Sequence, residues 1–154
     1  VQLFQEINKI LTSYTRGYLL VAAIVGGLTT LAMALLGMDF ALMLGIFAGL
    51  TELIPYFGPV IGAVPAVSLA VLQSKWLALK VVLAFIVIHQ LEGSIISPKI
   101  LGDKVGLHPL VVIVSLLIGG ELYGLVGMIL AVPGSAVLKV IIKYFIYRFK
   151  AAGN

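Results

Sequence analysis

Long apolar runs, separated by short polar stretches, dominate the hydrophobic pattern of this chain. Residues 18–36 (YLLVAAIVGGLTTLAMALL) carry no charged side chain and approach the length of about 20 residues that a helix needs to cross a bilayer. Within this run, Ala22, Gly26 and Gly27 offer small surfaces for close helix packing. Residues 76–91 (WLALKVVLAFIVIHQL) form a second run of this kind. The pattern predicts two continuous membrane-spanning helices over these ranges.

A third apolar region, residues 40–72, is interrupted by proline and glycine. Pro55 removes a backbone donor and clashes with the preceding turn, so a helix that enters from Phe40 is expected to break near Ile54. Neither arm has the length of a full span. Irregular backbone at membrane depth is tolerated only where protein buries it or a watery cavity solvates it. The region is predicted to be a short re-entrant hairpin or a pair of strongly kinked crossings.

Residues 110–147 repeat this arrangement. Glu121 follows a short apolar arm, as Glu52 does, and both returning arms contain the tripeptide Ala-Val-Pro. One crossing (76–91) separates the regions, so two related hairpins would have opposite orientations, and such inverted repeats are typical of secondary transporters. The residues expected to form the breaks and hinges are Pro55, Gly62, Pro65, Gly119, Gly120 and Pro133.

Residues 1–17 have a different pattern, with apolar side chains at helical spacing and polar side chains between them. This amphipathic helix could lie on the membrane surface or pack against a neighbouring subunit. A third interpretation, the end of a longer cytoplasmic or interfacial segment, is favoured. Residues 18–154 are then expected to form the transmembrane transport domain.

The composition agrees with an all-α, polytopic membrane helical bundle. Of the 154 residues, 62% are hydrophobic and 10% are charged, whereas soluble domains have about 25% charged residues. The net charge of +4 does not indicate nucleic-acid binding, because the basic residues flank apolar spans. The chain has no cysteine, no metal-binding histidine spacing, no phosphate loop and no catalytic triad pattern. Neither a cofactor nor an enzymatic activity is expected.

The charge distribution predicts an orientation in the membrane. With both termini and residues 93–109 in the cytoplasm, eight of the ten basic residues lie inside. Lys75 then lies outside, and Lys80 lies near the outer interface. This arrangement obeys the positive-inside rule.

Three separated motifs resemble the AI-2E family of bacterial transporters, namely ELIPYFGPVIGAVP, HQLEGSIISPKILGDKVGLHPLVV and IGGELYGLVGMILAVPGSAVLKV. The resemblance covers about residues 16–143 and corresponds to the conserved C-terminal half of longer family members. It implies a multi-pass protein of the bacterial inner membrane whose partners are lipids and further copies of itself, with a pentamer favoured.

The activity that the resemblance implies is export of autoinducer-2, a small polar signal of quorum sensing, by alternating access. Sodium (or lithium)–proton antiport is the alternative within the same class. An alternative from another class is a non-transporting membrane assembly or scaffold, since a chain without the N-terminal half could oligomerise and conduct nothing.

Glu52 is the first candidate for the transport pathway. A carboxylate deep in apolar sequence is costly unless it faces a cavity or a partner, and membrane carboxylates commonly mark ion or proton pathways. Its alternative role is to cap exposed amides or to lie at the interface. Glu121 is the counterpart of Glu52 in the repeat, with a place in a short loop as its alternative.

The other candidates lie near the breaks and at the end of the second crossing. Glu92 belongs to a QxEG pattern of the family, but it could instead anchor the helix end or pair with Lys99 or Lys104. His89 is expected to be a core or interface residue, and the tyrosines at the breaks could either bond a polar solute or pack. The full set expected along the substrate or ion pathway is Glu52, Tyr56, Gly58, Pro59, Gln90, Glu92, Glu121 and Tyr123.

Overall fold

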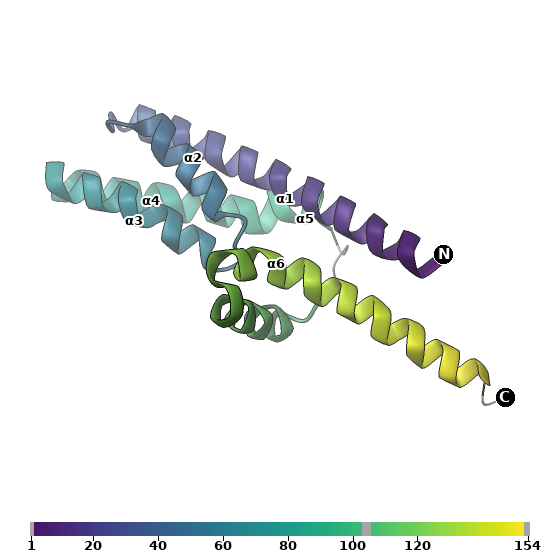
Figure 1. Cartoon of the computed structure of the whole chain (residues 1–154). Coiled ribbons are helices and arrows are strands. Elements are labelled where there is room, and N and C mark those ends of the chain that lie inside the picture. Colours follow the sequence, from purple (N-terminus) through teal and green to yellow (C-terminus); the bar gives the residue numbers. More distant parts are fainter. Residues whose placement is uncertain (1, 103–105, 153–154) are drawn as a thin grey trace. The chain divides into compact units, whose positions relative to one another are not determined.

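The computed structural model describes residues 2–102 and 106–152, which are helical along most of their length (Figure 1). No strand occurs among these residues, which confirms the predicted all-α class. Three stretches, 3–35, 75–100 and 109–151, are long and apolar enough to cross a membrane. The elements in chain order are α1 (Gln2–Leu35), α2 (Ala41–Thr51), α3 (Gly58–Gln73), α4 (Lys75–Leu91), the π-helix η1 (Glu92–Ile96), α5 (Ser97–Ile100) and α6 (Pro109–Ala152).

The contacts divide the described residues into two compact units. One unit comprises residues 17–102, and the other joins residues 2–16 with residues 106–152. We call the second one the α6 unit. Helix α1 runs without interruption through the boundary that was expected after residue 17.

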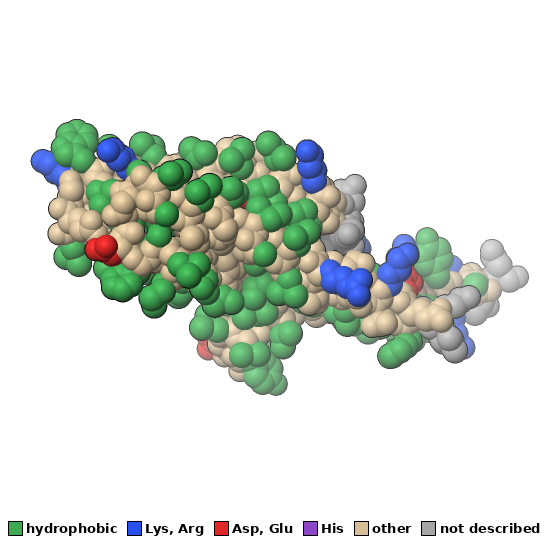
Figure 2. All heavy atoms as spheres, turned by 90° about the horizontal axis from the view of Figure 1, so that it is seen from above, with side chains coloured by type: hydrophobic (Ala, Val, Ile, Leu, Met, Phe, Trp, Pro, Cys, Tyr) green, Lys and Arg blue, Asp and Glu red, His purple; other side chains and the backbone are tan. Residues whose placement is uncertain are grey.

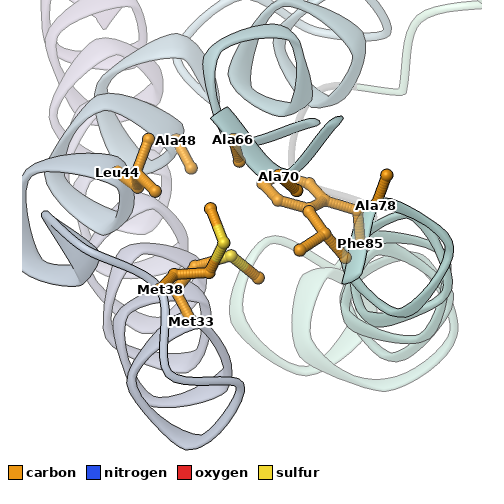
Figure 3. Packing of buried hydrophobic residues seen from close by; sticks show 9 residues of the cluster. Met33, Met38, Leu44, Ala48, Ala66, Ala70, Ala78 and Phe85 are labelled. Carbon is orange, nitrogen blue, oxygen red and sulfur yellow. The ribbon is translucent and has the colours of Figure 1, made fainter. Parts of the chain in front are cut away.

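The core of the 17–102 unit is built from small side chains that let four helices approach one another (Figure 3). Alanines of α2, α3 and α4 line the contact, and methionines near the end of α1 fill the space between them. Figure 1 shows that the α1–α2 and α3–α4 turns lie at the same end of this unit, so α2 and α3 form a hairpin that returns to its starting side. The buried cluster comprises Met33, Met38, Leu44, Ala48, Ala66, Ala70, Ala78, Val81 and Phe85.

Helices α1 and α2 approach closely enough for backbone to touch backbone. A Cβ atom added to Gly45 would lie 2.6 Å from the carbonyl oxygen of Gly26, and one added to Gly49 would lie 2.7 Å from that of Ala22. The expected packing role of Gly26 and Ala22 is confirmed. Gly27 faces away, because no described atom lies within 4 Å of a Cβ built there.

The exchange Gly49→Ala is expected to lower the thermal stability of the protein. The new methyl group would meet the Ala22 carbonyl at 2.7 Å, and overpacking of this kind costs about 1–3 kcal/mol. Gly27→Ala is the matched control on α1, since it has free space and favours the helix by about 1 kcal/mol. Thermal unfolding of both variants in detergent measures the difference. Equal melting temperatures would contradict the tight α1–α2 contact.

The break between α2 and α3 comes three residues earlier than expected, because α2 ends at Thr51 rather than near Ile54. The Ile54 N–H donates to the Thr51 carbonyl at 2.9 Å, so a tighter turn replaces the α-helical pattern before Pro55 is reached. A Cβ added to Gly58 would lie 2.1 Å from the same carbonyl oxygen, so glycine is required where α3 starts.

Other predicted hinges of this hairpin have different roles. A Cβ added to Gly62 would lie 2.7 Å from the Thr51 hydroxyl oxygen, so Gly62 serves the close contact between the arms. Pro65 lies inside α3 and does not interrupt it. Only the N–H groups in the first turn of a helix have no carbonyl to bond within the helix. Pro65 lies beyond the first turn of α3, so its missing N–H leaves one carbonyl of the preceding turn without its usual partner.

The α6 unit contains the second hairpin, because α6 turns back on itself (Figure 1). The backbone leaves helical geometry at Tyr123 (φ −137°, ψ 16°) and Gly124 (φ 59°, ψ −138°), where positive φ suits glycine. This break lies within the stretch 119–124 that was expected to interrupt the helix, but Gly119 and Gly120, which were expected to be hinges, have helical geometry. Pro133 also lies inside the helix rather than at a hinge.

The two arms of α6 meet through glycine and serine. A Cβ added to Gly127 would lie 1.8 Å from the carbonyl oxygen of Gly119, so the arms touch through their backbones. Farther from the break, the Ser135 hydroxyl donates to the Ser115 hydroxyl at 2.6 Å. Both apolar regions therefore turn back on themselves, as either predicted arrangement requires, and the choice between re-entrant hairpins and kinked crossings stays a prediction. Their inversion relative to each other stays a prediction.

Large hydrophobic side chains cover much of the surface shown in Figure 2, with few charged groups among them. Leu72, Leu35 and Tyr123 are 82%, 79% and 77% exposed. Soluble monomers rarely expose apolar patches larger than a few hundred Å². The surface suits contact with lipid, as the long apolar helices also indicate.

Candidate functional site

Glu52 lies in the turn that follows α2 and is buried inside the 17–102 unit. The residue is 6% exposed, and its Oε2 atom has no hydrogen-bond partner among the described residues. Its backbone N–H still bonds to the Ala48 carbonyl, so the backbone continues the helix while the side chain turns inward. An ionised carboxylate without a partner in such surroundings costs free energy, so this residue requires compensation.

The tip of the α2–α3 hairpin brings Glu52 to the far end of α4, where two polar residues face it. The Nδ1 atom of His89 lies 3.8 Å from Oε2 of Glu52. One ligand atom each from Glu52, His89 and Glu92 can be chosen so that all three lie within 4.8 Å of one another. We call these three residues the carboxylate–histidine cluster. Both ring nitrogens of His89 are buried and lack a hydrogen-bond partner among the described residues.

The local structure of α4 and η1 explains why His89 and Glu92 share a face. They are three residues apart, a spacing that places side chains on the same side of a helix. The helix then widens into the π-helix that starts at Glu92, and such segments occur frequently at functional sites. The centre of the Phe85 ring lies 5.9 Å from that of the His89 ring, so the imidazole packs against a residue of the hydrophobic core.

Hydrogen bonds within this segment hold the neighbouring polar side chains. Ser97 donates its hydroxyl hydrogen to Oε1 of Glu92. Gln90 donates from Nε2 to the Ser94 hydroxyl at 3.1 Å and so stays outside the cluster. Pairing with Lys99 or Lys104 was one alternative for Glu92. Among the described residues, Glu92 instead accepts the bond from Ser97, and Lys104 lies outside those residues.

The predicted residues at the hairpin tip shape the turn. Tyr56 has a positive φ of 63° and is 56% exposed, unlike the buried Glu52. Gly58 presses against the Thr51 carbonyl, and Pro59 occupies the first turn of α3, where its missing N–H is harmless.

Glu121 and Tyr123 belong to the α6 unit. Glu121 is exposed and helical, so it does not lie in the loop that was its alternative. Tyr123 is 77% exposed and forms the first residue of the break. Neither residue has the burial that distinguishes Glu52.

Of the predicted pathway residues, the structure brings together Glu52 and Glu92, and it adds His89. The sequence does contain a signal for His89, namely its HxxE spacing with Glu92 near the end of an apolar helix. That spacing is common on helices, and only the return of the α2–α3 hairpin shows that it faces a third ionisable group.

Long apolar helices and an ionisable cluster that contains a buried carboxylate define an integral membrane protein of the α-helical class. The chain belongs to the AI-2E transporter family, since the family model described as "AI-2E family transporter" matches residues 1–146.

Similar proteins from bacteria carry transport descriptions. The chain is 44% identical over 142 residues to "Putative transport protein YrrI" of Bacillus subtilis, covering 92% of this chain and 40% of that protein. It is 34% identical over 146 residues to "Putative permease PerM" of Escherichia coli, again covering 92% of this chain and 40% of the relative. The chain thus spans about two fifths of the length of these relatives.

Proposed function

We propose that the protein containing this chain is a secondary transporter whose charged site is the carboxylate–histidine cluster. The observation that carries the proposal is the buried Oε2 atom of Glu52, which lacks a hydrogen-bond partner among the described residues and faces His89. Ionisable groups inside membrane proteins are costly, and they commonly mark ion or proton pathways. Family membership supports the same class of function.

The position of the cluster suits alternating access. Glu52 lies on a short hairpin, whereas His89 and Glu92 lie on the long segment 75–100. A small displacement of the hairpin tip against that segment would change the distance between the ionisable groups and their access to water. Binding of a proton, a cation or a solute would then favour one of the two arrangements.

Two substrate classes follow from family resemblance. Export of a small polar solute such as autoinducer-2 is the first, with Glu52 bonding a solute hydroxyl. Cation–proton antiport, with sodium or lithium, is the second. Two neighbouring carboxylates, of which Glu52 is buried and Glu92 half-buried, favour the second class, because a cation neutralises them and a neutral solute does not.

Flux measurements on the full-length protein in proteoliposomes test the proposal. Autoinducer-2 and sodium are compared under an imposed pH gradient, with empty liposomes as the reference. Solute flux above the reference supports export, and sodium flux that follows the pH gradient supports antiport. Flux equal to the reference for both would overturn the proposal and favour a non-transporting assembly or scaffold.

We also propose that the protein is a homo-oligomer of the bacterial inner membrane with both termini in the cytoplasm. The exposed apolar side chains of the described helices provide surface for subunit contact as well as for lipid. The pentamer implied by the family resemblance is the assembly to test. Native mass spectrometry of the full-length protein, released from detergent micelles, would show five copies, and a monomer at all concentrations would contradict it.

A further inference from the structure

We propose that Glu52, His89 and Glu92 bind a divalent transition-metal ion such as Zn²⁺ or Mn²⁺. The donor set contains two carboxylates and one imidazole, all within the 17–102 unit. Carboxylates suit Mn²⁺, and imidazole suits Zn²⁺ and similar ions. The inference rests on the proposed function for the use of the ion, but binding can be measured without transport.

The geometry requires little movement to hold an ion. The three ligand atoms lie within 4.8 Å of one another. Ligands that bind Zn²⁺ at about 2.0–2.2 Å in a tetrahedron are themselves about 3.5 Å apart. Ordinary side-chain rotation of the two glutamates supplies the contraction. A water molecule or a solute oxygen would complete four-fold coordination, as in sites that keep one position open.

The burial of the ligands points to a bound partner independently of their spacing. Glu52 is 6% exposed, and its Oε2 atom lies 3.8 Å from His89 Nδ1, which is too far for a hydrogen bond. Both His89 nitrogens are likewise buried without a bond among the described residues. Buried polar atoms of native proteins are usually satisfied, so these atoms indicate a ligand.

The charge of the cluster matches a divalent cation. With a neutral imidazole and both carboxylates ionised, the cluster carries two negative charges, which one divalent ion neutralises. Ser97 donates to Oε1 of Glu92 and so orients this carboxylate, leaving Oε2 available for the metal. Sodium would use the carboxylates but would gain little from the imidazole, which is a ligand of transition metals. His89 therefore distinguishes the two ions.

Metal binding to the full-length protein, freed of metal with a chelator and kept in detergent, tests the inference. Equilibrium dialysis with Zn²⁺ and the electron paramagnetic resonance signal of free Mn²⁺ should show one tight site per protomer. Glu52→Gln and His89→Gln are each expected to weaken binding by about 100-fold, and Ser97→Ala by about 10-fold. The control variants Asp39→Asn and His108→Gln change exposed residues and should bind as the unchanged protein does.

Equal Zn²⁺ and Mn²⁺ affinities in the unchanged protein and in both ligand variants would overturn the inference, as would the absence of a stoichiometric site. Size-exclusion profiles identify a variant that fails to fold, and Ser97→Ala then supplies the remaining comparison. The failure modes are separable from those of transport. Flux that needs Glu52, without metal binding, would support the proposed function and overturn the metal site. Metal binding without flux would support the metal site and overturn the proposed function.

Discussion

Glu52→Gln is expected to remove most of the pH-dependent transport by the full-length protein, because it abolishes the coupling between proton and substrate binding, which is typically about 5- to 150-fold in affinity. Glutamine keeps the shape of the side chain but can neither carry the charge nor exchange the proton. The carboxylate lies 3.8 Å from His89 and is almost fully buried, so water cannot replace it in the site. Proteoliposome flux under an imposed pH gradient measures the change.

The same variant separates the two substrate classes. Under cation–proton antiport, the pH-dependent sodium flux should disappear. Under export of a neutral polar solute, transport should remain in part, with a changed apparent affinity for the solute. Asp39→Asn is the control, because Asp39 is an exposed carboxylate of the same unit.

The melting temperature of the Glu52→Gln variant shows whether lost flux results from unfolding of the protein. Replacing a buried charge by a neutral polar group of equal size is expected to leave the melting temperature unchanged or to raise it, since the cost of burying the charge is removed. Lost flux with an unchanged melting temperature identifies a functional role. Unchanged flux with unchanged pH dependence would rule out Glu52 as the coupling group.

The fold class and the hairpins could be predicted because their signals are local. A charge-free run of bilayer length predicts a span without knowledge of its neighbours, and residues 18–36 lie almost entirely within α1. Proline and glycine act on the backbone within one turn, so the interruption after α2 was expected within three residues of its observed place.

The second break lies within the predicted stretch 119–124, but the wrong glycines of that stretch were expected to be its hinges, because glycine has two uses that look the same in a sequence. Gly119 has helical geometry and is small so that the returning arm can touch it, whereas Gly124 provides the positive φ. Whether a glycine serves close contact or positive φ depends on where the returning arm packs. The sequence around Gly119 and Gly124 does not contain that information.

The carboxylate–histidine cluster shows the same limit for the site. Glu52 was predicted from its apolar surroundings, and Glu92 from a family pattern. Joining them needs the length of the hairpin and the direction of its return, which together place residue 52 beside residue 89. The π-helix that turns Glu92 toward Ser97 was also not visible, since π-helical geometry has no simple pattern of apolar residues.

Gly127→Ala is expected to open the α6 hairpin and to destabilise the protein by about 3 kcal/mol or more, the upper part of the range for overpacking. A Cβ atom there would lie 1.8 Å from the Gly119 carbonyl oxygen, so the backbones must separate. Gly134→Ala is the matched control on the same arm, because no described atom lies within 4 Å of its Cβ. Thermal unfolding in detergent measures both variants.

A cross-link distinguishes an open hairpin from a general loss of stability. The Ser115 and Ser135 hydroxyls lie 2.6 Å apart, and the chain contains no cysteine, so the double variant S115C/S135C should form a disulfide across the arms. Adding Gly134→Ala should leave this disulfide intact, whereas adding Gly127→Ala should slow its formation. Equally fast cross-linking in both would mean that the arms do not depend on the glycine contact. That result would also weaken the argument that the analogous contact between Gly58 and Thr51 holds Glu52 in its buried position.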